Sequence, residues 1–320
     1  MELPDLPVQR ELVERIARLL EGRREEIGER PMVLPTAEFF PDAFTADQPS
    51  VEKLVRRMQA HAGMDDIPIE VRVIAPEGEE EGEASSCGSG ACCSAPAPTA
   101  EGLTRLVDNG DGWTLNVPAL EVGHSVVLTA NIARALGYVF LKETESDEAP
   151  IEEPAEASAD LCAVELGFGE LLLEGSYIYT KSCGGPSIAT VTALRTPELA
   201  IAFSLFCAVG GHPLKRALGE LGATQRAALG EARDRVRSNP ALVETLKRTP
   251  ELVALGHFEL EDTRPWLMRA FGKKKKDGAG LDDIEAALAA APPRRNKPLA
   301  ADPADDELKE LVAEALSAQD

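Results

Sequence analysis

The chain has 320 residues, with 33 Lys and Arg against 55 Asp and Glu, so its formal net charge is −22. A field of this sign repels phosphate backbones and anionic lipid surfaces, which argues against nucleic-acid and membrane partners. The first residues have no apolar stretch typical of a secretory signal, and no run approaches the roughly 18 apolar residues of a membrane span. We therefore expect a cytoplasmic protein whose thiols stay reduced.

Two segments of biased composition divide the chain. Residues 77–101, rich in Glu, Ser, Ala and Pro, are predicted to be a flexible linker, and residues 273–320 an acidic, Pro-rich disordered tail with one possible short helix. Residues 1–76, with N-terminal helices, an aromatic arm and a first strand, are expected to form one globular domain together with residues 102–272, which supply a hairpin and a helical body.

The first part of the domain mixes helices with extended chain. Helical periodicity predicts a first helix from Val8 to Gly28, and a second from Ser50, as N-cap, to Ala62. Between them, Pro31–Phe44 holds three prolines and three phenylalanines, and we expect an extended arm that packs its aromatic rings onto the core. The alternation in Ile67–Ala75 predicts a strand.

A hairpin follows the linker. Asn-Gly and Asp-Gly steps between Leu103–Val107 and Trp113–Val117 are typical hairpin signals, so we expect a small antiparallel sheet. From Ser125 onward the pattern is helical, and no later strand is predicted. The fold class is therefore α+β, a small sheet followed by a mostly helical body.

The helical body begins with two strongly apolar segments. Val126–Lys142 should be a buried central helix, and Glu156–Glu174 a second apolar helix after an acidic loop. A third helix is predicted to start with Thr196 as N-cap and proline at the next position. Further helices are predicted at Leu214–Arg237 and Ala241–Lys247.

The order of sheet, buried helix, acidic loop and second helix resembles the core of gluzincin-type zinc metallopeptidases, over about a fifth of the chain. In that family the first helix carries His-Glu-x-x-His, in which two histidines grip zinc and the glutamate acts as base. The closest register here is Ala130-Asn131-Ile132-Ala133-Arg134. Ala130 and Arg134 replace the histidines and Asn131 replaces the base, so the resemblance implies a degenerate member without peptidase activity.

The resemblance also implies a vestigial site. Glu156 would stand at the position of the third zinc ligand, and Asp160 lies one helical turn further on. Carboxylates left without metal need another neutralising group, and Arg134 can supply it by pairing with Glu156 or Asp160. The alternative is that Arg134 forms an ordinary ion pair at the edge of the core.

Other local signatures of chemistry are missing. The four histidines, His61, His124, His212 and His257, are never three or four residues apart, so no helical histidine metal motif exists. No Gly-x-Ser-x-Gly elbow is present, which argues against a serine hydrolase.

Half of the six cysteines lie in the run CGSGACC, as Cys87, Cys92 and Cys93. Structural zinc needs four ligands, and Cys183 is the candidate for the fourth because it is the only other cysteine outside a predicted helix. The alternatives are a linker with incidental thiols and a thiol redox pair. Cys162 and Cys207 lie on apolar helix faces and are predicted to be buried.

Three functions remain compatible with these patterns. The first is a non-catalytic binding or scaffolding protein on a degenerate metallopeptidase-like core, with a protein partner and no cofactor. The second is a thiolate metal-binding protein, with zinc as the metal, or a thiol redox protein, using the CGSGACC loop. The third is a hydrolase with an unrecognised site.

Overall fold

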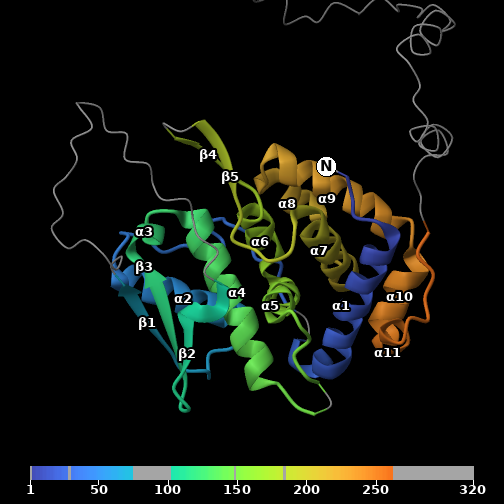
Figure 1. Cartoon of the computed structure of the whole chain (residues 1–320), viewed down its shortest axis with the longest axis horizontal. Helices are drawn as coiled ribbons and strands as arrows, with labels where there is room; N and C mark the ends of the chain where they lie inside the picture. Colours follow the sequence, from blue (N-terminus) through green and yellow to red (C-terminus); the bar gives the residue numbers. More distant parts are fainter. Residues whose placement is uncertain (1, 28–29, 75–101, 148, 183–184, 262–320) are drawn as a thin grey trace, which may run out of the picture. The chain divides into compact units, whose positions relative to one another are not determined.

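The computed structural model describes residues 2–27, 30–74, 102–147, 149–182 and 185–261. They form an α+β fold, with a three-stranded sheet beside a body of helices, and this confirms the predicted class (Figure 1). The predicted linker 77–101 and tail 273–320 lie outside the described residues. The strands are β1 Ile69–Ile74, β2 Leu106–Asp108, β3 Trp113–Pro118, β4 Ile178–Ser182 and β5 Gly185–Ala189.

The helical segments follow the same chain order. The α-helices before the second strand pair are α1 Leu6–Ile27, α2 Gln48–Ala62, α3 Ala119–Val122, α4 Ser125–Glu143, α5 Ala155–Ala163 and α6 Gly169–Gly175. Those after it are α7 Thr196–Gly210, α8 Leu214–Glu220, α9 Ala223–Arg237, α10 Pro240–Arg248 and α11 Pro250–Ala254. A 3-10 turn, η1 Gly102–Arg105, and a π-helical turn, η2 Val164–Phe168, complete the list.

The three-stranded sheet is mixed and has the order β1-β3-β2. The predicted hairpin is confirmed, because β2 and β3 pair antiparallel around a turn in which Asp108 Oδ1 accepts the Gly110 N–H at 2.8 Å. The expectation of a wholly antiparallel sheet is wrong, since β1 runs parallel to β3 from Ile69–Trp113 to Ile74–Pro118. The chain between these strands is long enough to return to the starting end of the sheet, as parallel pairing requires.

The hairpin of β4 and β5 was not predicted, and the expectation of helices alone after Ser125 is wrong. Of the side chains in these strands whose burial is described, Tyr179 and Ile188 are 54% and 62% exposed. The sequence of the two strands shows no clean apolar alternation that would reveal them.

Helix α4 is the central helix of the body, as predicted, with twelve buried residues. It packs against α5 and α6 and lies between the sheet and α5 in Figure 1. By length and composition α4 could cross a membrane, yet 67% of its most apolar window is buried inside the fold. Close packing with α5 depends on Gly137, where an added Cβ would lie 2.4 Å from the Ala159 carbonyl oxygen.

The predicted helix Glu156–Glu174 is interrupted at η2. Gly167 there has φ +98°, and an added Cβ would lie 2.1 Å from the carbonyl oxygen of Pro31. Its own carbonyl accepts the N–H of Val33 at 3.0 Å, so the arm after α1 runs directly against the interruption. A glycine is required at this position because left-handed backbone and close approach coincide.

The arm packs on the core mainly through aliphatic side chains. Met32, Val33 and Leu34 are buried, whereas Phe44 is 44% exposed, so the prediction of aromatic packing is wrong for Phe44. Phe39 and Phe40 are partly buried and lie edge-on to His61. The arm thus leaves aromatic surface available at its end.

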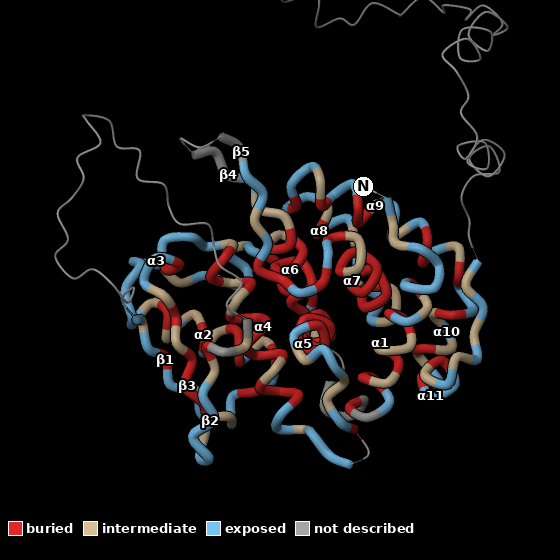
Figure 2. The backbone as a smooth tube through the Cα atoms, viewed as in Figure 1, coloured by how far each residue is buried: buried red, intermediate tan, exposed pale blue. Residues whose placement is uncertain are grey.

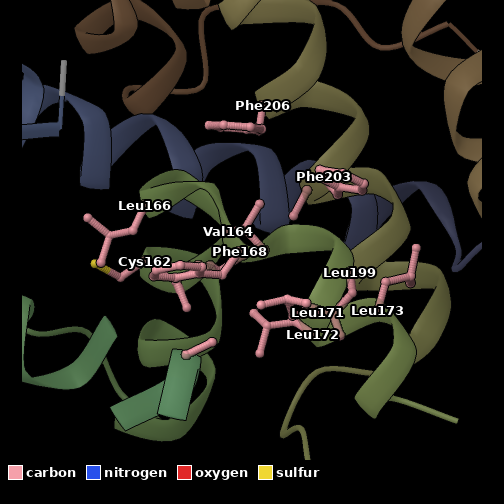
Figure 3. Packing of buried hydrophobic residues seen from close by; sticks show 14 of the residues in the cluster. Cys162, Val164, Leu166, Phe168, Leu171, Leu172, Leu173, Leu199, Phe203 and Phe206 are labelled. Carbon is pink, nitrogen blue, oxygen red and sulfur yellow. The ribbon is translucent and has the colours of Figure 1, made fainter. Parts of the chain in front are cut away.

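Helices α6 and α7 are buried along most of their length (Figure 2). Figure 3 shows side chains of η2 and α6 in the core together with Leu199, Phe203 and Phe206 of α7. Gly169 allows Phe203 to approach α6, since an added Cβ would lie 2.4 Å from its ring.

Some predicted helix boundaries differ from the structure. Asp47, not Ser50, caps α2, and its side chain accepts the Ser50 N–H. Arg195, not Thr196, precedes the first turn of α7. The predicted helix Leu214–Arg237 is two helices, because the chain is extended at Leu221 and Gly222.

Replacement of Gly137 tests the α4–α5 contact. We expect Gly137→Ala to lower the free energy of unfolding by about 1–3 kcal/mol, because the new methyl group overlaps the backbone of α5. The matched control is Gly230→Ala in α9, where the added Cβ meets nothing within 4 Å, and it should raise stability by up to about 1 kcal/mol. Urea unfolding measures the free energy of unfolding of both variants. Equal changes in the two would contradict the close packing of α4 on α5.

Candidate functional site

Arg134 and Asp160 form a buried ion pair between α4 and α5. Arg134 Nε donates to Asp160 Oδ1 at 2.5 Å, and their side chains are 5% and 0% exposed. Arg134 Nη1 also donates to the carbonyl oxygen of Val191 at 2.6 Å. One of the two predicted pairings of Arg134 is therefore present, and it is with Asp160.

The second oxygen of Asp160 fixes the chain before α7. Asp160 Oδ2 accepts the backbone N–H groups of Ala193 and Leu194 at 2.7 and 2.9 Å. Burial raises the pKa of Asp160, and the guanidinium of Arg134 with these two N–H donors opposes that rise. The carboxylate thus joins α4, α5 and residues 191–194 in one buried network.

The other two residues of the predicted vestigial site lie apart from this pair. Glu156 is exposed in the first turn of α5, and no contact with Arg134 is found among the described residues. Asn131 donates from Nδ2 to Glu121 Oε2 at 3.0 Å. Glu121 in turn accepts two hydrogen bonds from Arg105 in a buried, bidentate ion pair.

The Arg105–Glu121 pair was missed by the sequence analysis. Its partners are sixteen residues apart and belong to η1 and α3, and neither periodicity nor a short motif joins them. A cavity of about 20 Å³ lies between Arg105, Glu121, Asn131 and Arg134, which is room for about one water molecule. Arg134 therefore lines the same small hollow as the Arg105–Glu121 pair.

The residues of this region do not fit a zinc ion. Ala130 has no ligand atom and packs with Val127 and Val191 in a small apolar cluster. Arg134 holds a permanent cation at the second histidine position and occupies the nearest carboxylate, Asp160. Among the described residues no group of three His, Cys, Asp or Glu side chains is arranged to hold a metal.

Two further glutamates are buried within η2 and α6. Burial raises the pKa of Glu165 to about 8. Burial, with the charges of Glu174 and Glu220, raises the pKa of Glu170 to about 9. Both oxygens of Glu170 are buried without a hydrogen-bond partner in the described structure. A neutral carboxylic acid tolerates such a place far better than a carboxylate does.

An open apolar pocket of about 360 Å³ lies at the start of α4. Its walls come from the arm after α1, from α2, and from the first turn of α4. The apolar lining includes Phe40, Phe44, Leu54, Val126 and Leu128, and the charged lining is Asp42, Lys53, Arg57 and Glu174. Lys53 and Arg57 both pair with Asp42.

The four cysteines of the predicted metal site, Cys87, Cys92, Cys93 and Cys183, lie outside the described residues, so that site stays a prediction. Cys162 and Cys207 are buried, as predicted. Burial raises the pKa of both thiols, which keeps them protonated and unreactive.

Comparison with known proteins adds no relative: no protein-family model, curated protein or solved structure matches this chain. What the fold and site define is an α+β protein whose central helix pair is joined by a buried Arg–Asp pair.

Removal of the buried charge tests the role of Arg134. We expect Arg134→Met to lower the free energy of unfolding by about 3–5 kcal/mol, because Asp160 loses its buried counter-charge. Asp160→Asn should be costly too, and the double variant should cost less than the two single losses added together. Arg72→Met, which breaks an exposed pair with Glu70, is the control and should leave the free energy of unfolding nearly unchanged. Urea unfolding in which Arg134→Met behaves like the control would contradict this role.

The raised pKa of Glu170 predicts a pH dependence of stability. The folded protein keeps a proton that the unfolded chain releases above about pH 4.5, so this contribution to stability is complete at low pH and is lost as pH rises toward about 9. The side chain at this position in Glu170→Gln is uncharged at every pH. The stability of this variant relative to the wild type should therefore rise by more than about 1 kcal/mol from about pH 5 to pH 9.

Thermal unfolding across this pH range measures the difference for Glu170. The matched control is Glu251→Gln, at an exposed position of α11. If the difference in stability between the wild type and Glu170→Gln stays constant with pH, Glu170 is ionised in the folded protein.

Proposed function

We propose that this protein is a non-catalytic cytoplasmic binding protein, built on a degenerate metallopeptidase-like core, which receives a segment of a partner protein in the pocket at the start of α4. The observation that carries the proposal is the closed Arg134–Asp160 network beside an open apolar pocket. The residues at the catalytic positions implied by the resemblance form hydrogen bonds within the protein, while the apolar pocket remains open to a ligand.

The closed network leaves little for peptide hydrolysis. Every oxygen of Asp160 is engaged, Arg134 is engaged through two of its nitrogen atoms, and the amide of Asn131 is held by Glu121. An amide and a guanidinium do not act as a general base near neutral pH. The surrounding hollow, with room for about one water molecule, cannot admit a peptide.

The pocket has the size and lining of a binding site. Its volume of about 360 Å³ lies in the range of ligand pockets, and its lining is largely apolar. Two cations and two carboxylates on its wall balance each other, so a strongly charged ligand is not favoured. The exposed ring of Phe44 extends the apolar surface to the outside.

The start of α4 favours a peptide over other apolar ligands. Among the described residues no side chain caps this helix, so the N–H groups of its first turn have no side-chain acceptor there and can donate to a carbonyl oxygen. Ser125 and Val126 of this turn line the pocket together with the apolar residues. A protein segment offers both parts, an apolar side chain for the pocket and backbone carbonyl groups for the helix end.

Selection of peptides from a random displayed library on the full-length chain tests the proposal. We expect selected peptides to carry an apolar or aromatic anchor and to bind Phe44→Asp at least tenfold more weakly, because a carboxylate then stands in the apolar wall. Leu255→Asp is the matched control, since Leu255 is 71% exposed and does not line the pocket, and its affinity should equal that of the wild type.

Two results would overturn the proposal. One is a set of selected peptides that bind Phe44→Asp as tightly as the wild type, which would place the site elsewhere. The other is hydrolysis of the bound peptides, seen by mass spectrometry, that is lost in Asn131→Ala. The first result concerns the pocket, and the second concerns the absence of catalysis.

A further inference from the structure

A second hollow of about 390 Å³ lies between α1, the loop after α4 and the start of α5. This loop passes beside the C-terminal part of α1 in Figure 1. Three arginines of α1, Arg15, Arg18 and Arg23, line it, and they have no part in the proposed function. We call this hollow the arginine cleft.

One carboxylate in the arginine cleft serves two guanidinium groups. Arg18 donates from Nε and Nη2 to the two oxygens of Glu152. Arg15 Nε lies 3.6 Å from Glu152 Oε2, beyond hydrogen-bond range, and is buried without a hydrogen-bond partner. A donor of Arg15 is therefore available for another anionic oxygen.

The remaining polar groups hold the walls of the cleft in place. Arg15 Nη2 donates to Ser158 Oγ at 2.9 Å, and Ser158 Oγ donates to the carbonyl oxygen of Glu152 at 2.6 Å. Arg23 donates to Thr144 Oγ1 at 2.8 Å and to the Ala149 carbonyl oxygen at 2.7 Å. Arg23 thereby ties the loop to α1 and preserves the cleft between them.

The cleft also has apolar walls. Its apolar lining is contributed by α1, α4, α5 and the loop, through Leu19, Leu141, Ala149, Pro150, Ile151 and Leu161. A volume of about 390 Å³ exceeds the need of a single small anion and lies in the range of small-molecule sites.

We propose that the arginine cleft binds a small molecule that carries a phosphate group, with Arg15 and Arg18 as donors, and that the phosphate displaces the carboxylate of Glu152. Guanidinium forks bind phosphate oxygens with two parallel hydrogen bonds each. Arg18 already donates to both oxygens of the Glu152 carboxylate. A phosphate group has a third oxygen, which can accept from Arg15. The side chain of Glu152 is 32% exposed and can turn outward.

The charge of the chain makes this site selective. A protein of net charge −22 repels anions over most of its surface, so an anion that binds must find a local concentration of cations. The cleft supplies three arginines against two glutamates, Glu21 and Glu152. The apolar walls then receive the organic part of the molecule.

Titration calorimetry of the full-length protein with phenyl phosphate tests this proposal. We expect the affinity for phenyl phosphate to fall at least tenfold in Arg18→Gln, because this change removes the more exposed of the two arginine donors. We expect the affinity to rise several-fold in Glu152→Gln, because the side chain that competes with phosphate for the arginines is then neutral. Arg72→Gln and Glu70→Gln, which alter an exposed Arg–Glu pair remote from the cleft lining, are the matched controls and should bind as the wild type does.

Each contrary result has a distinct meaning. Absence of binding at millimolar phenyl phosphate, or equal affinity in Arg18→Gln, would overturn the site. Benzoate that binds as tightly as phenyl phosphate would replace the phosphate assignment with a carboxylate. Inorganic phosphate that binds as tightly as phenyl phosphate would remove the role of the apolar walls. Thermal unfolding of each variant distinguishes a lost site from a lost fold, and none of these results bears on the pocket at α4.

Discussion

The buried pair of Arg134 and Asp160 is the constraint on which the helical body depends. Transfer of two charges out of water is costly, and a single buried pair compensates for it only when the surrounding groups complete its hydrogen bonds. Here the backbone at Val191, Ala193 and Leu194 does so. The segment that leads into α7 is therefore positioned by the same pair that joins α4 to α5.

The same need for internal partners shapes the neighbouring region. Glu121, another buried carboxylate, accepts hydrogen bonds from Arg105 and Asn131, and Arg134 lines the same small hollow as these three residues. The two larger hollows lie elsewhere, at the start of α4 and along α1. The enclosed ion pairs thus differ from Arg18 in the arginine cleft, whose side chain is 39% exposed.

Many helices and strands of the fold could be predicted because each buries one continuous face, which gives a regular spacing of apolar residues. Helix α4 and the Asn-Gly hairpin follow local patterns of apolar spacing and turn chemistry, and both were found from the sequence. The parallel pairing of β1, the β4–β5 ribbon and the interruption at Gly167 were not. The parallel pairing and the interruption depend on contacts between residues distant in sequence, such as Pro31 against Gly167, and local periodicity carries no information about such contacts.

The candidate site divides in a similar way. The resemblance implied that Arg134 pairs with one of two carboxylates, Glu156 or Asp160, and the structure has the pair with Asp160. Glu156, one turn earlier, belongs to the end of α5 that faces solvent, and helical spacing alone does not distinguish the two. Glu165 and Glu170 stand in an almost wholly apolar stretch of the sequence, and this composition indicates their burial.

The buried acids also change the electrical character of the whole molecule. The formal charge counts every carboxyl group as ionised at pH 7. With pKa values of about 8 and about 9, Glu165 and Glu170 are mainly protonated there. The folded chain therefore carries nearly two fewer negative charges than its composition states. In an electric field or on an anion exchanger, the folded protein behaves as a weaker polyanion than the same chain unfolded.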